Sequence, residues 1–180
     1  MQIISLKKIL FGLVAGLLLT GCSMAALTVS FDTASIDFGS VAPGEWKEAP
    51  LTRDHDTLVV ISDTGNVWEA KISVTQALTN GAAPSVTIPN DNFRWMSTYA
   101  GNKNAPYTNL GAGLNHPAGL GYVNFSTIDE LVYTSGKEPT YIDNNNSPAG
   151  TEIQFKWGMA MPSSQRAGAY TTTVRWTVTQ

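Results

Sequence analysis

The chain has 180 residues, a formal net charge of −3 and a charged fraction of only 14%. Its 16 glycines and 9 prolines are typical of an extracellular β-protein rather than of a cytosolic helical one. Without residues 1–21, which hold two lysines and no acid, the net charge is −5. Beyond that segment Lys and Arg are scattered along the chain, and phosphate backbones require clustered cations. We therefore exclude nucleic acid as a partner.

The first 21 residues predict an export signal. A short basic lead ending at Lys8 precedes an apolar run over residues 9–19, which is too short to span a bilayer as a stable helix. The sequence Leu-Thr-Gly-Cys that ends at Cys22 resembles the lipobox of bacterial lipoprotein precursors, in which the cysteine is lipidated and begins the mature chain. Cys22 is also the sole cysteine, so no disulfide can form within the chain. The alternative is an ordinary secretory signal that is cleaved near Ala25 or Ala26. Both predict export. The lipoprotein interpretation gives a signal helix in residues 1–21 and a single β-domain in residues 22–180.

Alternating apolar residues predict strands from the start of the mature chain. Short strands are expected over residues 27–31 and 36–38, followed by a polar loop over residues 45–56. The apolar run 58–61 suits a central strand. The sequence Asp-Thr-Gly-Asn at residues 63–66 is strong turn chemistry, because Gly and Asn tolerate positive φ angles. We therefore predict a hairpin that joins the central strand to a second strand over residues 68–76.

The middle of the chain predicts short strands separated by long polar segments. The short strands are expected at residues 86–88, 93–96, 122–125 and 131–134. Between them, residues 97–121 mix Asn, Gly and Pro without periodicity, so a long functional loop is expected there. A second polar loop is expected at residues 137–150.

Two long alternating segments close the sequence. Residues 153–161 and 170–178 each place bulky apolar side chains at every second position, which is typical of half-buried strands, and we predict that they form the last hairpin. On this parity we expect Trp68, Trp157 and Trp176 inside the protein. Trp46 and Trp95 are flanked by predicted loops and are expected at the surface. The fold class is all-β, an antiparallel β-sandwich or jelly-roll of about 8–10 short strands.

Parts of the sequence resemble the WxL-type cell-surface domains. The C-terminal resemblance lies in Ala-Gly-Ala-Tyr at residues 167–170, the threonines that follow, and Trp-Thr-Val at residues 176–178. The predicted turn at residues 61–66 with Trp68, and residues 86–93, resemble the middle of such domains. The two Trp motifs read Trp-Glu-Ala and Trp-Thr-Val here, where the family has Trp-x-Leu. The resemblance implies a secreted, β-rich protein that is retained noncovalently at a Gram-positive wall.

Candidate chemistry is sparse. The chain has two histidines, His55 and His116, and no Gly-x-Ser-x-Gly sequence, so a nucleophilic hydrolase is not expected. No cofactor is expected, and calcium is the one cation that stays open. Its weak candidate ligands are Asp91, Asp143 and Asn145, which lie in Asn- and Asp-rich clusters that turn formation also explains.

Three functions remain open. The first is a non-catalytic, lipid-anchored surface protein with a structural or adhesive role, which contacts the membrane through Cys22 and a cell-envelope polymer, a glycan or another copy of the chain through exposed side chains. The second is a subunit of an extracellular filament assembled by strand addition through residues 26–31. The third is a carbohydrate-binding module. The candidate contact residues are Trp46, Trp95, Tyr99, Tyr107 and His116.

Overall fold

The computed structural model describes residues 27–102, 105–138 and 146–180. The predicted signal helix and Cys22 lie outside these ranges. The described chain is an antiparallel all-β protein, which confirms the predicted fold class. Its strands are β1 (Leu27–Phe31), β2 (Trp46–Glu48), β3 (Asp56–Asp63), β4 (Glu69–Val74), β5 (Leu78–Asn80), β6 (Thr87–Ile88), β7 (Phe93–Asn102), β8 (Ala105–Asn109), β9 (Val123–Asn124), β10 (Glu130–Thr134), β11 (Asn146–Ala160), β12 (Tyr170–Thr171) and β13 (Val174–Thr179). Three short 3-10 turns accompany them, η1 (Asn90–Asn92), η2 (Gly111–Gly113) and η3 (Ser135–Lys137).

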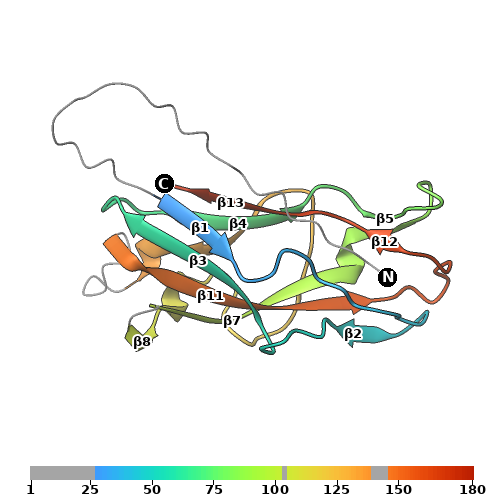
Figure 1. Cartoon of the computed structure of the whole chain (residues 1–180), viewed down its shortest axis with the longest axis horizontal. Coiled ribbons are helices and arrows are strands. Elements are labelled where there is room, and N and C mark those ends of the chain that lie inside the picture. Colours follow the sequence, from blue (N-terminus) through green and yellow to red (C-terminus); the bar gives the residue numbers. More distant parts are fainter. Residues whose placement is uncertain (1–26, 103–104, 139–145) are drawn as a thin grey trace, which may run out of the picture.

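The strands form two layers (Figure 1). One layer is a seven-stranded sheet in which five strands follow the order β1-β3-β11-β7-β8. The other two strands are short: β2 pairs with β11 on the same side as β3, and β9 pairs with β7 on the same side as β8. The other layer holds two three-stranded sheets, β10-β4-β13 and β12-β5-β6. These two sheets lie end to end, because β4 leads into β5 and β12 leads into β13.

Side-chain parity fills the space between the layers. Alternate residues of β4, β11 and β13 are buried as the sequence predicts, and Trp68, Trp157 and Trp176 have exposed fractions of 0%, 2% and 8%. Aromatic rings pack between the layers. The ring centroid of Trp176 in β13 lies 4.9 Å from that of Phe155 in β11 and 5.4 Å from that of Phe31 in β1. Burial of each aromatic side chain contributes roughly 2 to 3 kcal/mol to the free energy of folding.

Both predicted hairpins are wrong. The turn at residues 63–66 has the predicted chemistry, with Gly65 at φ +70°, but β3 pairs with β1 and β11 whereas β4 pairs with β10 and β13. The turn therefore carries the chain from one layer to the other. In the same way β11 and β13 belong to opposite layers. Turn residues permit a reversal of the chain, but they do not decide whether the flanking strands pair or face each other.

Three predicted loops contain strands. The expected loop over residues 97–121 begins with the second half of β7 and then contains β8, so that, of the residues described there, those over 110–121 lie outside the named strands. The expected loop over residues 45–56 contains β2, and β11 begins at Asn146, inside the expected polar loop 137–150. Conversely, residues 36–38 form no strand, although Ile36 and Phe38 are buried as core residues.

Candidate functional site

The outer face of the seven-stranded sheet aligns one row of side chains across four strands. Gly158 of β11 lies opposite Glu48 of β2 and opposite Arg94 of β7, and Arg94 lies opposite Asn124 of β9. Directly opposed residues place their side chains on the same face. Met159 and Trp157 occupy the other parity of β11 and are buried, so this row faces outward.

Trp46 lies beside this row and exposes 44% of its surface. Tyr122 packs edge-on against it with ring centroids 4.8 Å apart, and the Arg94 guanidinium lies 5.8 Å from the Trp46 ring centroid. Gly158 lies beneath the outer ring of Trp46, where any Cβ would collide with the Trp46 ring atoms. We call Trp46, Tyr122, Arg94 and Gly158 the Trp46 shelf. It presents an aromatic ring to solvent in a fixed position.

Hydrogen-bonding groups surround the shelf. Burial, and then the Glu48 carboxylate, raise the pKa of Tyr122, so its hydroxyl stays neutral at physiological pH. Arg94 donates from Nε to the Asp91 carbonyl over 3.1 Å. Further along the outer face, Lys156 donates to Asp54 over 2.8 Å, and this hydrogen bond raises the pKa of Lys156. The Tyr122 hydroxyl oxygen is itself buried, so the shelf offers an exposed aromatic ring bordered by charged groups, which suits binding but supplies no nucleophile.

The two tryptophans predicted at the surface have opposite environments. Trp46 is exposed, as predicted. The prediction for Trp95 is wrong, because its exposed fraction is 0% and it packs edge-on against Phe155 and His116. Trp95 lies in the first half of β7 on the inward parity. Because the sequence predicted a strand of only four residues here, the inward parity of Trp95 was not recognised.

The other predicted contact residues do not join the shelf. Tyr99 is half-buried and lies across Gly101, and burial raises its pKa. His116 bonds Glu130 over 2.7 Å and holds its ring edge-on to Trp95, so it is a packed side chain rather than a free loop residue. Tyr107 is in β8, where the structure describes the backbone alone.

The calcium candidates are not brought together. Asp91 is exposed in η1, and its carboxylate accepts a hydrogen bond from the Asn92 side chain over 3.1 Å. Asp143 and Asn145 lie outside the described residues. Within the described ranges, no group of three or more His, Cys, Asp or Glu residues is arranged to hold a metal ion.

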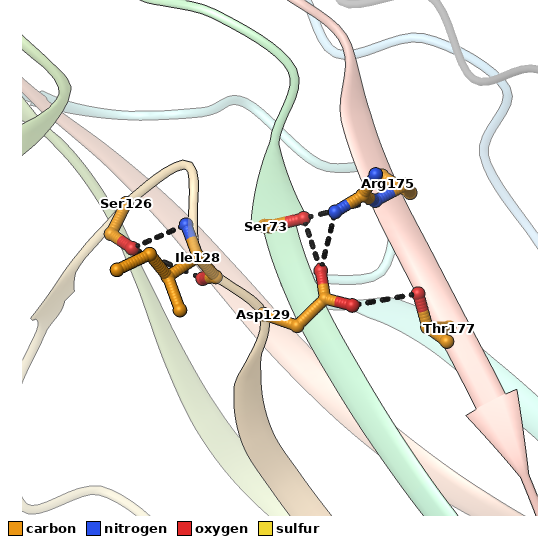
Figure 2. Close-up of polar contacts among 6 residues, drawn as sticks. All are labelled: Ser73, Ser126, Ile128, Asp129, Arg175 and Thr177. Atoms are coloured by element: carbon orange, nitrogen blue, oxygen red, sulfur yellow. Dashed lines mark hydrogen bonds and ion pairs between the residues drawn. The ribbon is translucent and has the colours of Figure 1, made fainter.

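An ionic network on the outer face of the β10-β4-β13 sheet was not predicted from the sequence (Figure 2). Asp129 accepts hydrogen bonds from Ser73 at 2.7 Å, Arg175 at 2.8 Å and Thr177 at 3.2 Å. These bonds, that from Ser73 first, hold the pKa of Asp129 below its ordinary value. Because Ser73 donates to a carboxylate that is already neutralised by Arg175, the network fastens a loop to β4 and β13 and does not activate a nucleophile. The polar parity of the closing strand was visible in the sequence, but its partner Asp129 was not.

Asp129 and Glu130 face apart, as expected for neighbours in an extended segment. Asp129 points to Ser73, and Glu130 bonds His116. The two carboxylates therefore do not form the paired arrangement that glycoside hydrolysis uses.

An open groove of about 480 Å³ lies between residues 33–39 and 47–52. Lys47, the one basic residue in its lining, already donates to the Ser40 carbonyl over 2.9 Å. The ammonium group of Lys47 is therefore already hydrogen-bonded within the protein.

Comparison with known proteins does not place the chain in a family. No family model, no curated protein and no solved structure matches it. In the part of the chain that the structure describes, no helix has the length and apolar character needed to cross a membrane.

Proposed function

We propose that this protein is exported, is anchored to a membrane by a lipid on Cys22, and has a non-catalytic structural or adhesive role at the cell surface. The observation that carries the proposal is the Trp46 shelf, a half-exposed indole held in place by Tyr122, Arg94 and Gly158. Exposing a large aromatic ring in a fixed position forgoes burial energy, and such residues commonly serve as contact anchors. The shelf would contact a cell-envelope polymer, a glycan or another protein.

The position of the single cysteine supports the anchor. Cys22 follows a short apolar run and lies five residues before the first strand residue, Leu27. A diacyl lipid at this position would hold the sandwich close to the membrane while leaving its outer faces free. The WxL-like stretches are consistent with a protein of the cell surface, and the proposal assigns no reaction and no cofactor.

The anchor is tested by mass spectrometry of the mature N-terminus. We expect a chain that begins at lipidated Cys22, and Cys22→Ser should release the protein into the medium. An unmodified chain that begins at Ala25 or Ala26 would remove the anchor from the proposal but leave export in place.

The contact role is tested by binding of the purified protein to cell-envelope fractions. Trp46→Ala should reduce binding at least about tenfold, as expected for loss of an anchor worth 1.4 kcal/mol or more. Ile128→Ala is the matched control, because Ile128 is also an exposed apolar side chain, at 78%, but lies away from β2 in the loop before β10. Equal binding by the two variants would contradict a role for the shelf.

A carbohydrate-binding module is the second candidate. Trp46 shares the outward face with Glu48 and Asn124, which are both exposed, and so combines an apolar platform with donors and acceptors, which is how proteins bind the faces and hydroxyls of sugars. Of Trp46 and Trp95, which were both predicted at the surface, Trp46 alone is placed to do this, because Trp95 is buried. Glycan-array binding that disappears in Trp46→Ala would favour this candidate over adhesion to a protein.

A further inference from the structure

Strand β1 forms an edge of the seven-stranded sheet (Figure 1). Among the described strands it pairs with β3 alone, from Leu27 opposite Ser62 to Phe31 opposite Leu58. The Asp32 amide donates to the Thr57 carbonyl over 3.2 Å. Because hydrogen-bonded pairs alternate along an antiparallel ladder, Thr28 and Ser30 also bond toward β3. The amides and carbonyls of Leu27, Val29 and Phe31 therefore point away from the sheet.

This edge lacks the features that normally prevent strand pairing. Its sequence is Leu-Thr-Val-Ser-Phe, with no charge and no proline, and β-branched and aromatic residues favour extended pairing. Val29 is exposed to 39%. Phe31 packs on Trp176 with centroids 5.4 Å apart, which holds the end of the strand in place. The edge is thus uncharged, and no described strand other than β3 pairs with it.

We propose that β1 pairs antiparallel with β1 of a second copy of this chain, about a two-fold axis that passes beside Val29. In this register Val29 lies opposite its own copy, and Leu27 of each chain lies opposite Phe31 of the other. All outward-pointing backbone groups then face one another and form about six hydrogen bonds. The pairing joins two seven-stranded sheets into one.

The side chains make the register self-complementary, which identifies the second copy as the partner. On the inner side, Leu27 meets Phe31 of the other chain, and the half-exposed Val29 is covered by its twin. On the outer side, Thr28 lies opposite Ser30, and hydroxyl side chains form favourable cross-strand pairs. A two-fold interface requires one surface that fits itself, and this five-residue strand meets that requirement.

This inference goes beyond the proposed function and uses none of the Trp46 shelf. It differs from strand donation, because β1 stays in its own sheet and acts as an edge rather than as a strand given to a neighbour. Its consequence is that one assembly carries two shelves, so that binding to a repetitive polymer gains from bivalency.

The test is sedimentation velocity of the full chain in a nonionic detergent, over a wide range of protein concentration. All variants keep the same N-terminal segment, so any association through that segment is constant. Val29→Pro removes an outward amide without touching the bonds to β3, and proline is tolerated on strand edges. We expect a concentration-dependent dimer, with a dissociation constant raised at least about tenfold by Val29→Pro because each dimer loses two hydrogen bonds.

Val29→Glu is the second variant, because it places two like charges on the axis and keeps the backbone unchanged. Val67→Glu is its control at an exposed valine outside β1. A wild-type chain that stays monomeric at every concentration would overturn the proposal. So would a dimer that Val29→Glu does not weaken, or growth into fibres, which requires an open rather than a two-fold contact.

Cross-linking checks the register. In a Cys22→Ser background, Val29→Cys should form a disulfide-linked dimer under mild oxidation, because the two Cα atoms in a hydrogen-bonded pair lie about 5.5 Å apart. Thr28→Cys should not, since Thr28 lies opposite Ser30 and not opposite itself. Equal cross-linking at the two positions would overturn the register.

Discussion

Asp129 contributes to stability through charge, and acid should remove that contribution. Its folded-state pKa is below the ordinary value of 3.8, so the stabilisation is present above that pH and is lost as the pH falls through the lowered pKa. We expect Asp129→Asn to lower the free energy of unfolding at neutral pH by about 1 kcal/mol, the usual scale for a partly exposed charged hydrogen bond. Urea unfolding across the acidic range measures the difference, which should shrink toward zero in strong acid.

Asp91→Asn provides the control for that experiment. Asp91 is exposed, and its side chain accepts a hydrogen bond from the neighbouring Asn92, so surface substitution there should change stability by less than about 0.5 kcal/mol. A difference between wild type and Asp129→Asn that stays constant with pH would contradict the charge-based explanation.

Glu138 should show the opposite pH dependence. It is 9% exposed, accepts a hydrogen bond from the Gly113 amide over 2.6 Å and lies beside Tyr133, and burial raises its pKa above the ordinary 4.5. The ionised form is therefore disfavoured in the fold, and stability should rise as the pH falls from neutral through the raised pKa. Glu138→Gln keeps an acceptor for Gly113 and cannot ionise. We expect the variant to be at least as stable as wild type at neutral pH and to lose this rise.

Thermal unfolding of both proteins between neutral pH and pH 4.5 makes the comparison. A wild-type protein that loses stability over this interval by more than Glu138→Gln would contradict the assignment.

At the scale of elements, β11 and β2 together decide where Trp46 lies. Gly158 leaves room for the Trp46 ring on β11, and Tyr122 also approaches within 3.0 Å of a Cβ placed there. Gly158→Ala should therefore displace the Trp46 ring without breaking the ladder. We expect acrylamide to quench the tryptophan fluorescence more strongly and envelope binding to fall as it does in Trp46→Ala.

Gly81→Ala is the matched control, since nothing lies within 4 Å of a Cβ at that position. The Trp46→Phe variant is measured in parallel, because it shows how much of the tryptophan fluorescence comes from Trp46. If quenching and binding are unchanged in Gly158→Ala, the ring does not depend on Gly158 for its position.

Element type was predictable from the sequence wherever the apolar alternation was long. The parity of residues 68–74, 153–159 and 174–178 predicted which side chains are buried, because a strand has only two faces. Trp95 was misplaced because the inward parity of β7 continues with Ser97, which carries no apolar signal, and then shifts at an irregularity between Ser97 and Tyr99. The position of the Trp46 shelf required the pairing of β2 with β11, which no local pattern contains.

Layer assignment was not predictable, for a related reason. The turn at residues 63–66 and the return at residues 162–169 are compatible both with a hairpin and with a crossing between layers. What decides between them is competition for the edges of β3 and β11, which are taken by strands far away in sequence: β1 and β11 flank β3, and β3 and β7 flank β11. Such choices are global, because each edge can be filled only once.

At the scale of the whole molecule, the shelf lies at the opposite end from the start of β1. Leu27 pairs with Ser62, which pairs with Ser147, whereas Trp46 pairs with Ala160 at the far end of β11. The rise per residue along β11 separates these ends by roughly 40 Å, and Figure 1 shows β2 at the end away from the first residues of β1. If a lipid at Cys22 holds the Leu27 end near a membrane, the shelf points away from it.

This orientation is measurable by energy transfer from the protein to acceptor lipids in vesicles that carry the lipidated chain. Donor dyes are attached at Asn66→Cys, in the turn near the Leu27 end, and at Ser163→Cys, in the exposed loop after β11. We expect stronger transfer from position 66 than from position 163, because transfer falls steeply over tens of ångströms. Equal transfer would mean that the sandwich lies flat on the membrane, and stronger transfer from position 163 would place the Trp46 shelf against the lipid, where it could not reach a polymer outside the cell.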